Sequence, residues 1–279
     1  MTTTQADKAR AFRALHEASV PFIIPNPWDI GSARLLEALG FKALATTSAG
    51  YAFTLGLPDN AVGRDQMIRH LAELAPSTDL PVSADLENGF GDAPEEAAET
   101  IRQAAAAGVV GGSIEDATGR AGDPIYAHEL AVERVRAAVE AARSLPFPFT
   151  LTARAENYLN GRADLADTIR RLQAFQEAGA DVLYAPGLKT REDIAAVVSS
   201  VDRPVNVLMG MAGMPFSVDD LAQMGVKRIS VGGALARAAL GALLRAANEM
   251  LGRGTFTYTN EAASMKEVTD LFAAVRKHD

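Results

Sequence analysis

The sequence predicts an α/β fold, a single (β/α)8 TIM barrel that spans residues 1–279. A short apolar segment, a polar or glycine-bearing turn and an amphipathic helix follow one another eight times along the chain. The strand segments are largely continuous apolar runs, as expected for parallel strands buried on both faces. No linker-like change of composition separates the repeats, so we expect one domain. An open, doubly wound sheet is the alternative, because periodicity does not show whether a sheet closes.

The repeats set the expected elements in order. The expected strands are Phe22–Pro25, Lys42–Thr46, the segment from Pro81, Val109–Glu115, Phe149–Ala153, Asp181–Tyr184, Pro204–Leu208 and Lys227–Val231. The expected helices are Gln5–Ser19, Ile30–Leu39, Arg64–Leu74, Pro94 to near Gly108, Tyr126–Arg143, Asp164–Glu177, Arg191–Val198, Val218–Met224 and Gly233 to about Leu251. Pro94 suits a first helical turn, and Gly40 and Gly179 suit helix ends. A long turn-rich segment is expected between Thr46 and Asp59.

The tail from Asn260 to His278 predicts one more amphipathic helix. Its apolar residues recur at helical spacing: Val268, Leu271, Phe272 and Val275. Eight helices already cover the barrel, so we expect residues from about 245 to 279 to form a C-terminal helical extension. A subunit interface and the chain's own barrel are both open as its partner surface.

Composition excludes several classes of function. The net charge of −8, without a run of like charges, argues against nucleic-acid binding. No apolar run reaches membrane-spanning length, and the polar start Met1–Arg10 does not resemble a signal peptide, so we expect a cytoplasmic protein. The chain has no cysteine, which excludes disulfides, thiolate metal sites and cysteine nucleophiles.

The most informative stretch runs from Pro81 to Asp92. Asp85 and Glu87 end an apolar strand one residue apart, and the alternation of side chains puts them on one side of it. Two close carboxylates repel each other unless a positive charge lies between them, and a hard cation with oxygen ligands suits this place. A strand end with solvated acids is the alternative.

Polar residues follow almost every predicted strand, where barrel enzymes carry their chemistry. They are Asn26, Trp28, Asp29, Thr46, Thr47, Ser48, Gly50, Asp85, Glu87, Glu115, Asp116, Arg154, Glu156, Tyr184, Asn206 and Ser230. The acids Asp85, Glu87, Glu115 and Asp116 fit one Mg²⁺ or Mn²⁺. No histidine stands at a strand end, so zinc is not expected.

Several of these residues have two interpretations. Arg154 suits a bidentate carboxylate or phosphonate, or a salt bridge to a neighbouring acid. The backbone amides from Ser48 to Gly50 suit an oxyanion, or belong to an ordinary turn. Trp28 suits a substrate wall or simple packing, and Asn206 suits a substrate hydrogen bond or a contact with a neighbouring loop.

Five motifs stand in one order: Asn26–Arg34, Thr47-Ser48 with Gly56–Asp59, Asp85–Gly91, Ser113–Asp116 and Thr152–Arg154. Together they resemble the isocitrate lyase/phosphoenolpyruvate mutase superfamily over nearly the whole chain. The resemblance implies a Mg²⁺-dependent enzyme that acts on a small α-oxo or α-hydroxy carboxylate. It also implies cleavage or formation of a C–C or P–C bond next to an enolate. Members often exchange the last helix with a neighbour and form dimers or tetramers, which implies a homodimer or homotetramer here.

The resemblance also implies roles for single residues. Asp85 matches the direct metal ligand, while Glu87 and Glu115 match ligands that act through water, supported by Asp59. The remaining matches concern the substrate: Ser48, Ala49 and Gly50 hold its oxygens through backbone groups, Trp28 walls its pocket, and Arg154 binds and polarises it. Mg²⁺, Arg154 and oriented amides together suit an enolate as it forms.

The loop after Glu115 departs from the family pattern. Isocitrate and methylisocitrate lyases carry a catalytic cysteine there, and phosphonate-cleaving members carry a lysine and an asparagine. This chain offers Thr118, Arg120 and Asp123 instead, between glycines that suit a mobile lid. Three hypotheses therefore stand: a C–C bond lyase for a methylisocitrate- or oxaloacetate-like acid, a phosphonopyruvate P–C hydrolase or mutase, and a non-catalytic oxo-acid-binding barrel.

Overall fold

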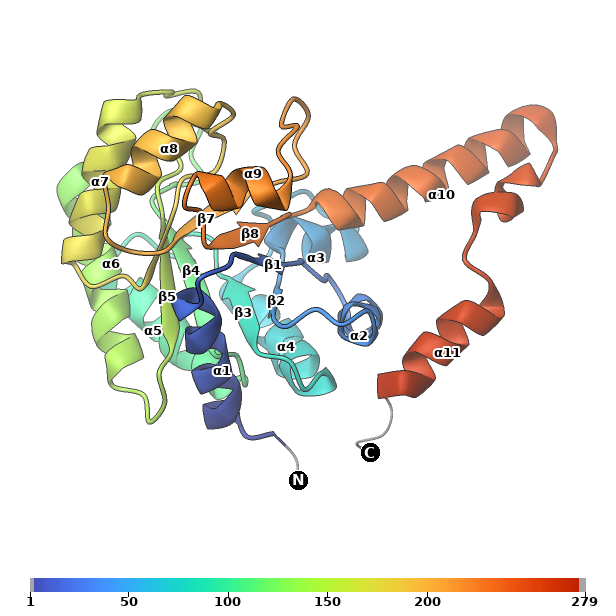
Figure 1. Cartoon of the computed structure of the whole chain (residues 1–279), viewed down its shortest axis with the longest axis horizontal. Coiled ribbons are helices and arrows are strands. Elements are labelled where there is room, and N and C mark those ends of the chain that lie inside the picture. The colour runs from blue at the N-terminus through green and yellow to red at the C-terminus, as the bar shows by residue number, and fades with distance from the viewer. Residues whose placement is uncertain (1–2, 276–279) are drawn as a thin grey trace.

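Eight parallel strands form a nearly closed barrel in the computed structural model, which describes residues 3–275 (Figure 1). The strands are β1 Phe22–Ile24, β2 Leu44–Ala45, β3 Val82–Asp85, β4 Gly111–Glu115, β5 Thr150–Arg154, β6 Val182–Tyr184, β7 Val205–Leu208 and β8 Arg228–Ser230. Their order is β1-β8-β7-β6-β5-β4-β3-β2, with every neighbour parallel. At the seam, the Ala45 amide donates to the Pro25 carbonyl at 3.0 Å. The predicted barrel is therefore confirmed, and the open sheet is not.

Helices cover the outside of the strands (Figure 1). They are α1 Gln5–Glu17, α2 Ile30–Ala38, α3 Ser48–Thr54, α4 Arg64–Leu74, α5 Pro94–Ala106, α6 His128–Arg143, α7 Leu165–Glu177, α8 Arg191–Ser199, α9 Val218–Gln223, α10 Ala234–Arg253 and α11 Met265–Val275, with the 3-10 turns η1 Ala75–Ser77 and η2 Thr257–Glu261. Most of the buried apolar residues lie between these helices and the strands. None of the described helices is long and apolar enough to cross a membrane.

Helix α1 packs against the barrel interior through Phe12, which is completely buried with Ile24 and Ala45 in a second, smaller core. A side chain at Gly111 would bring its Cβ within 2.8 Å of the Phe12 ring. Gly111 is therefore the residue of β4 that allows this helix to approach so closely.

Two predicted segments differ from the structure. The segment after Thr46 is not only turns: Thr47 caps the short helix α3 by accepting from the Gly50 amide at 3.2 Å. Strand β3 ends at Asp85, and Glu87 lies beyond it with φ of +50°. The alternation of side chains along a strand therefore does not place Glu87, although Glu87 still faces the same cavity as Asp85.

The C-terminal extension leaves the barrel. Helix α10 projects away from the strands, and α11 returns beside α2 of the same chain (Figure 1). The predicted tail helix is thus confirmed over Met265–Val275, and residues 276–279 lie outside the described part of the chain. No described residue of α11 is buried, so its contact with the barrel is shallow.

Candidate active site

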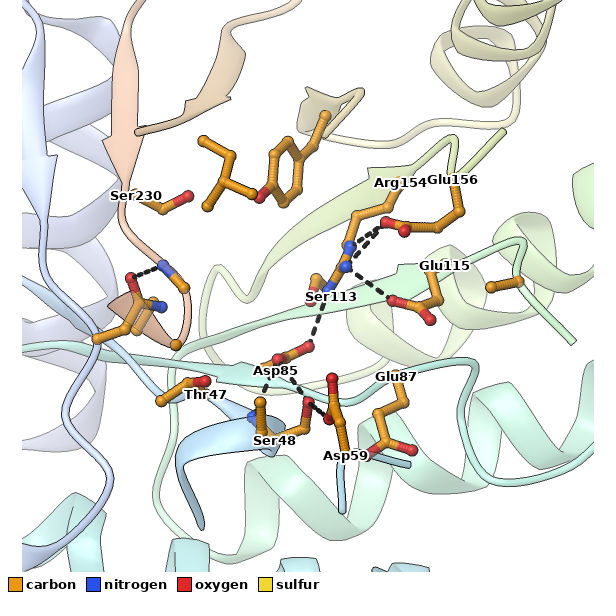
Figure 2. Close-up of a pocket in the computed structure, with 18 of the residues that line it drawn as sticks. Thr47, Ser48, Asp59, Asp85, Glu87, Ser113, Glu115, Arg154, Glu156 and Ser230 are labelled. Carbon is orange, nitrogen blue, oxygen red and sulfur yellow. Dashed lines mark hydrogen bonds and ion pairs between the residues drawn. The ribbon is translucent and has the colours of Figure 1, made fainter. Parts of the chain in front are cut away.

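A cavity of about 400 Å³ opens at the carboxyl ends of the strands, and it collects most of the predicted site residues (Figure 2). Its walls include Ser48, Ala49, Asp59, Asp85, Glu87, Glu115 and Arg154. The cavity volume suits a small organic ligand. The side chains that line it are mainly polar, which is unusual for a barrel interior and typical of a binding or catalytic site.

Arg154 lies at the centre of three carboxylates (Figure 2). Its nitrogens lie 2.9 Å from Asp85 Oδ1, 2.9 Å from Glu115 Oε2 and 2.8 Å from Glu156 Oε1. Burial lowers the pKa of the Arg154 guanidinium, but the charges of Glu115 and Glu156 outweigh it and hold that pKa above its ordinary range. The ring of Tyr184 lies 5.2 Å from the guanidinium carbon. Arg154 therefore forms salt bridges to neighbouring acids, one of its two interpretations from the sequence.

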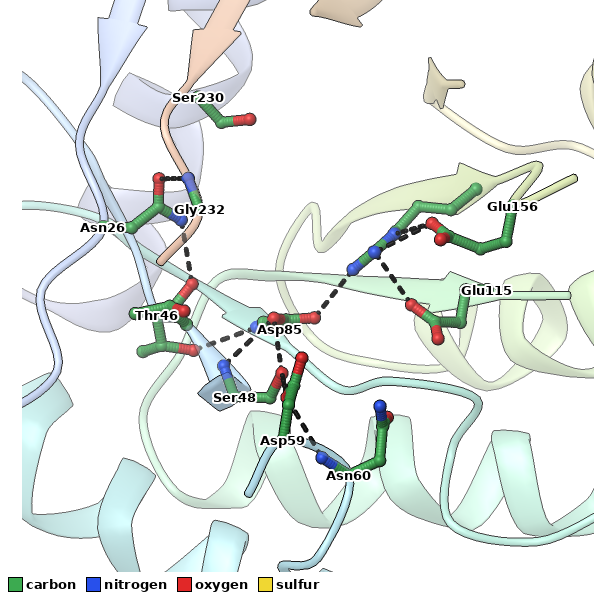
Figure 3. A network of polar contacts seen from close by, with 12 residues as sticks. Asn26, Thr46, Ser48, Asp59, Asn60, Asp85, Glu115, Glu156, Ser230 and Gly232 are labelled. Atoms are coloured by element: carbon green, nitrogen blue, oxygen red, sulfur yellow. Dashed lines mark hydrogen bonds and ion pairs between the residues drawn. The ribbon is translucent and has the colours of Figure 1, made fainter. Parts of the chain in front are cut away.

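Asp85 is held from two sides (Figure 3). Its Oδ2 accepts from the amide and the hydroxyl of Ser48, both at 3.0 Å, while the Ser48 hydroxyl also lies 3.1 Å from Asp59 Oδ1. Burial and the charge of Asp85 raise the pKa of Asp59. Two of the three amides expected to bind an oxyanion, those of Ser48 and Gly50, thus already have acceptors within the protein.

Glu87 is the least satisfied acid of the cavity. Its side chain is buried, with 7% of its surface exposed, and its Oε1 has no hydrogen-bond partner. Burial, followed by the charges of Asp85 and Asp59, raises the pKa of Glu87 to about 8. A buried carboxylate with an unpartnered oxygen is costly unless a ligand satisfies it.

The acids are not arranged as a complete metal cage. Within residues 3–275, no three histidine, cysteine or acidic side chains converge closely enough to enclose a metal ion. The available metal donors are all oxygens. The cavity holds five carboxylates and two guanidinium groups: Asp59, Asp85, Glu87, Glu115, Glu156, Arg154 and Arg228. This donor set fits Mg²⁺, which keeps several water ligands and uses only one or two carboxylates directly.

Some predicted residues lie elsewhere. Asp116, expected among the metal-binding acids, points away from the cavity and pairs with Arg171 at 3.0 Å, because side chains alternate and its neighbour Glu115 points inward. Asn206 is also outside the cavity lining, and its Nδ2 donates to Ser230 Oγ at 2.9 Å. Of the two interpretations of Asn206, a substrate hydrogen bond or a contact within the protein, the structure shows a contact within the protein, with strand β8.

Trp28 and Gly50 lie behind the cavity wall rather than on it. A Cβ at Gly50 would lie 2.9 Å from the Trp28 Cβ and 2.6 Å from Thr47 Cγ2, so the two residues pack against each other. Only glycine allows α3 to sit this close to Trp28. Trp28 is half-buried and supports the position of α3, which carries Ser48 and Ala49 to the cavity.

The loop after Glu115 folds as a short hairpin over the site. The Thr118 amide donates to the Pro124 carbonyl at 2.8 Å, and the Thr118 hydroxyl donates to the Asp123 carbonyl. Arg120 binds both oxygens of Asp92, at 2.9 and 2.8 Å. Only Ala117 and Gly119 of this loop line the cavity. The side chains expected to replace the missing cysteine are therefore engaged outside it.

Sequence reasoning missed several residues of the cavity. The sequence marks Glu156 only as an acid at a strand end, yet its carboxylate is buried and pairs with Arg154. Arg228 opens β8 and also lines the cavity. Arg228 is a charged residue in a short apolar strand, and this is the signal that marks it in the sequence.

Asn26 links the two strands at the seam of the barrel to the loop after β8. It donates to the Thr46 carbonyl and accepts from the Gly232 amide, both at 2.9 Å (Figure 3).

The model of the phosphoenolpyruvate phosphomutase family matches residues 12–251. The chain belongs to the isocitrate lyase/phosphoenolpyruvate mutase superfamily. The superfamily match covers the barrel and the start of the C-terminal extension, and it includes every residue that lines the cavity. The resemblance drawn from the five motifs is thereby confirmed.

Similar proteins include two that are named for reactions of oxaloacetate. An oxaloacetate decarboxylase of Paraburkholderia xenovorans is 32% identical over 72% of this chain and 67% of its own. A candidate lyase/mutase of Burkholderia cenocepacia has a solved structure with 65% identity and a TM-score of 0.94, covering 96% of each chain. Oxaloacetate acetylhydrolase bound to its product oxalate is 25% identical, with a TM-score of 0.86 over 97% of this chain and 95% of the other.

Proposed function

We propose that this protein is a cytoplasmic, Mg²⁺-dependent enzyme that cleaves a C–C bond of a small 2-oxo or 2-hydroxy di- or tricarboxylate, with oxaloacetate as the best-supported type. One observation carries the proposal: Arg154 and an excess of buried carboxylates share one cavity at the carboxyl ends of the strands. Two of the similar proteins are named for reactions of oxaloacetate. Decarboxylation breaks the bond between its methylene carbon and the distal carboxyl carbon, whereas hydrolysis to oxalate breaks the bond between its keto and methylene carbons.

The charge balance of the cavity supports a divalent cation. Within the described chain, five carboxylates line the cavity with only two guanidinium groups, those of Arg154 and Arg228, and the buried Glu87 oxygen has no partner. Asp85 is our proposed direct ligand, and Glu87 and Glu115 are proposed to act through water, with Asp59 in support. Bound Mg²⁺ would supply positive charge next to the substrate oxygens. Phosphonopyruvate hydrolase, which shares the fold at 24% identity, has been solved with oxalate and Mg²⁺.

Arg154 is the proposed substrate-binding residue. Without a ligand, its donors neutralise Asp85 and Glu115. A divalent cation gives both carboxylates a second positive partner, which leaves Arg154 donors for a substrate carboxylate or keto oxygen. A guanidinium beside such an oxygen stabilises the negative charge of an enolate as it develops. The nearby Tyr184 ring limits the movement of Arg154 and keeps its donors directed into the cavity.

This chain differs from cysteine-dependent lyases in the group that could protonate the enolate product. Among residues 3–275, no lysine, cysteine or histidine lines the cavity. We therefore propose that an enolate product takes its proton from water that enters under the hairpin of residues 117–125. This favours an oxaloacetate-type cleavage over reactions that need a strong side-chain acid.

We also propose a homodimer or homotetramer in which α10 and α11 contact a second copy. Helix α10 exposes several large apolar side chains: Leu240, Leu243, Leu244, Met250 and Leu251. Leu251 has 88% of its surface exposed. A contiguous apolar surface of this kind is typical of a protein interface.

The proposal is tested by product analysis. We would incubate the protein with oxaloacetate, methylisocitrate or phosphonopyruvate, with Mg²⁺ or EDTA, and measure pyruvate, oxalate, succinate and phosphate. We expect Mg²⁺-dependent cleavage of oxaloacetate. Asp85→Asn should lower kcat at least a hundredfold, while Asp65→Asn, which changes an exposed acid in the first turn of α4, should not. Phosphate release would favour the P–C reaction, and binding without any product would favour the non-catalytic hypothesis.

A further inference from the structure

Arg228 is a buried cation without an anionic partner. It belongs to β8, only 4% of its surface is exposed, and it lines the cavity described above. Its Nη1 donates to Thr152 Oγ1 at 2.9 Å, while its Nε has no partner. Within residues 3–275, no carboxylate lies close enough to form an ion pair with it. Arg228 therefore places a positive charge without an ion pair in the wall of the cavity.

Among the described residues, no ion pair compensates the charge of Arg228: Asp85 favours it only from beyond ion-pair distance, and Arg154 opposes it. The ring of Phe12 lies 5.9 Å from the guanidinium carbon on the closed side of the barrel. Burial lowers the pKa of Arg228 to about 10, so the side chain remains charged at neutral pH. A buried charge without an ion pair is costly for stability, which points to a role in binding.

The side chain of Arg228 reaches across the barrel interior. Its strand β8 lies four strands from β4 in the strand order, but its Nη1 donates to Thr152 on β5, two residues before Arg154. Arg154 on β5 is surrounded by three carboxylates, whereas Arg228 has none. The cavity thus holds one arginine that is paired with carboxylates and a second one that is not.

We propose that Arg228 binds a second carboxylate of the substrate, at the part of the cavity wall that lies next to Thr152. This assignment rests on the proposed function, in which Arg154 and the metal hold the first carboxylate and the reacting bond. It makes Arg228 a specificity residue for dicarboxylates over monocarboxylates of the same length. Thr152, whose hydroxyl accepts from Nη1, holds the guanidinium in place, and Nη2 remains for a charge-assisted hydrogen bond to a carboxylate.

Calorimetric titration with two matched pairs of probes tests the assignment. Succinate and succinamate, and malonate and malonamate, differ within each pair only in one carboxylate replaced by an amide. Titrations use Mg²⁺-loaded protein. We expect the wild type to prefer at least one dianion over its amide by tenfold or more. In Arg228→Met this preference should fall to within twofold, and Arg228→Lys should lie between the two. Arg203→Met, at an exposed arginine before β7, is the control and should match the wild type.

The outcomes separate this assignment from the proposed function. A folded Arg228→Met that keeps the wild-type preference would overturn the role of Arg228, as would a wild type without any preference. If Arg228→Met does not fold, Arg228→Lys decides: a preference reduced threefold or more supports the role, and an unchanged one overturns it. Oxalate is titrated separately, with Mg²⁺ or EDTA. An oxalate affinity independent of Mg²⁺ would overturn the proposed metal site, while the probe ratios would still decide the role of Arg228.

Discussion

Glu87 gives the sharpest test of the electrostatics of the site. Burial, then the charges of Asp85 and Asp59, raise its pKa from 4.5 to about 8 in the metal-free protein. At about 1.4 kcal/mol per pKa unit, ionised Glu87 opposes folding by at most about 5 kcal/mol, and local relaxation reduces this value. The native state holds this proton more tightly than the unfolded state does. The stability due to Glu87 is therefore fully present below pH 4.5 and is lost as pH rises through 8.

Glu87→Gln keeps the shape of the side chain and removes its charge. In EDTA, we expect the variant to gain about 2–4 kcal/mol of unfolding free energy over the wild type at pH 9, and almost nothing at pH 5. Urea unfolding followed by circular dichroism from pH 5 to 9 measures both. With Mg²⁺ the order should reverse, because the variant lacks a carboxylate for the metal shell. If the unfolding free energies of the two proteins in EDTA differ by the same amount at every pH from 5 to 9, the reasoning is refuted.

Two further predictions concern the hairpin and the C-terminal extension. Arg120→Ala removes the contact of the hairpin with Asp92. We expect faster amide hydrogen exchange in residues 118–124 and an unchanged urea midpoint. Unchanged exchange would show that the contact does not hold the hairpin. The double variant Leu243→Glu and Leu251→Glu should shift the protein to monomers in sedimentation experiments, because both leucines are exposed on α10. A wild type that is already monomeric would exclude the proposed interface.

The barrel and the acids at its strand ends could be predicted from the sequence because both depend on local patterns. Continuous apolar runs mark buried parallel strands, and the carboxyl ends of such strands meet at one end of a barrel. This reasoning brought Asp85, Glu115 and Arg154 into one cavity. Neighbouring side chains alternate, so the inward position of Glu115 indicates that Asp116 points away from the cavity. Asp116 does so, and it pairs with the buried Arg171.

Other features depend on contacts between distant segments, which periodicity does not show. The helix α3 is short, and its cap Thr47 gives a weak signal beside the glycines that follow. The unpaired state of Arg228 depends on which side chains fill the barrel interior, including Phe12 from α1. The departure of α10 from the barrel is likewise invisible in its amphipathic pattern, because such a pattern names an apolar face and not its partner.

The central claim is that Mg²⁺ and a carboxylate ligand share the cavity between Asp85 and Arg154. The most direct measurement is a crystal structure of the protein with Mg²⁺ and oxalate. We predict one metal ion bound by Asp85, with Glu87 and Glu115 contacting its water ligands, and oxalate in contact with Arg154. An ordered oxalate without metal near Asp85, or a metal bound elsewhere while Arg154 keeps its three carboxylate partners, would contradict the account.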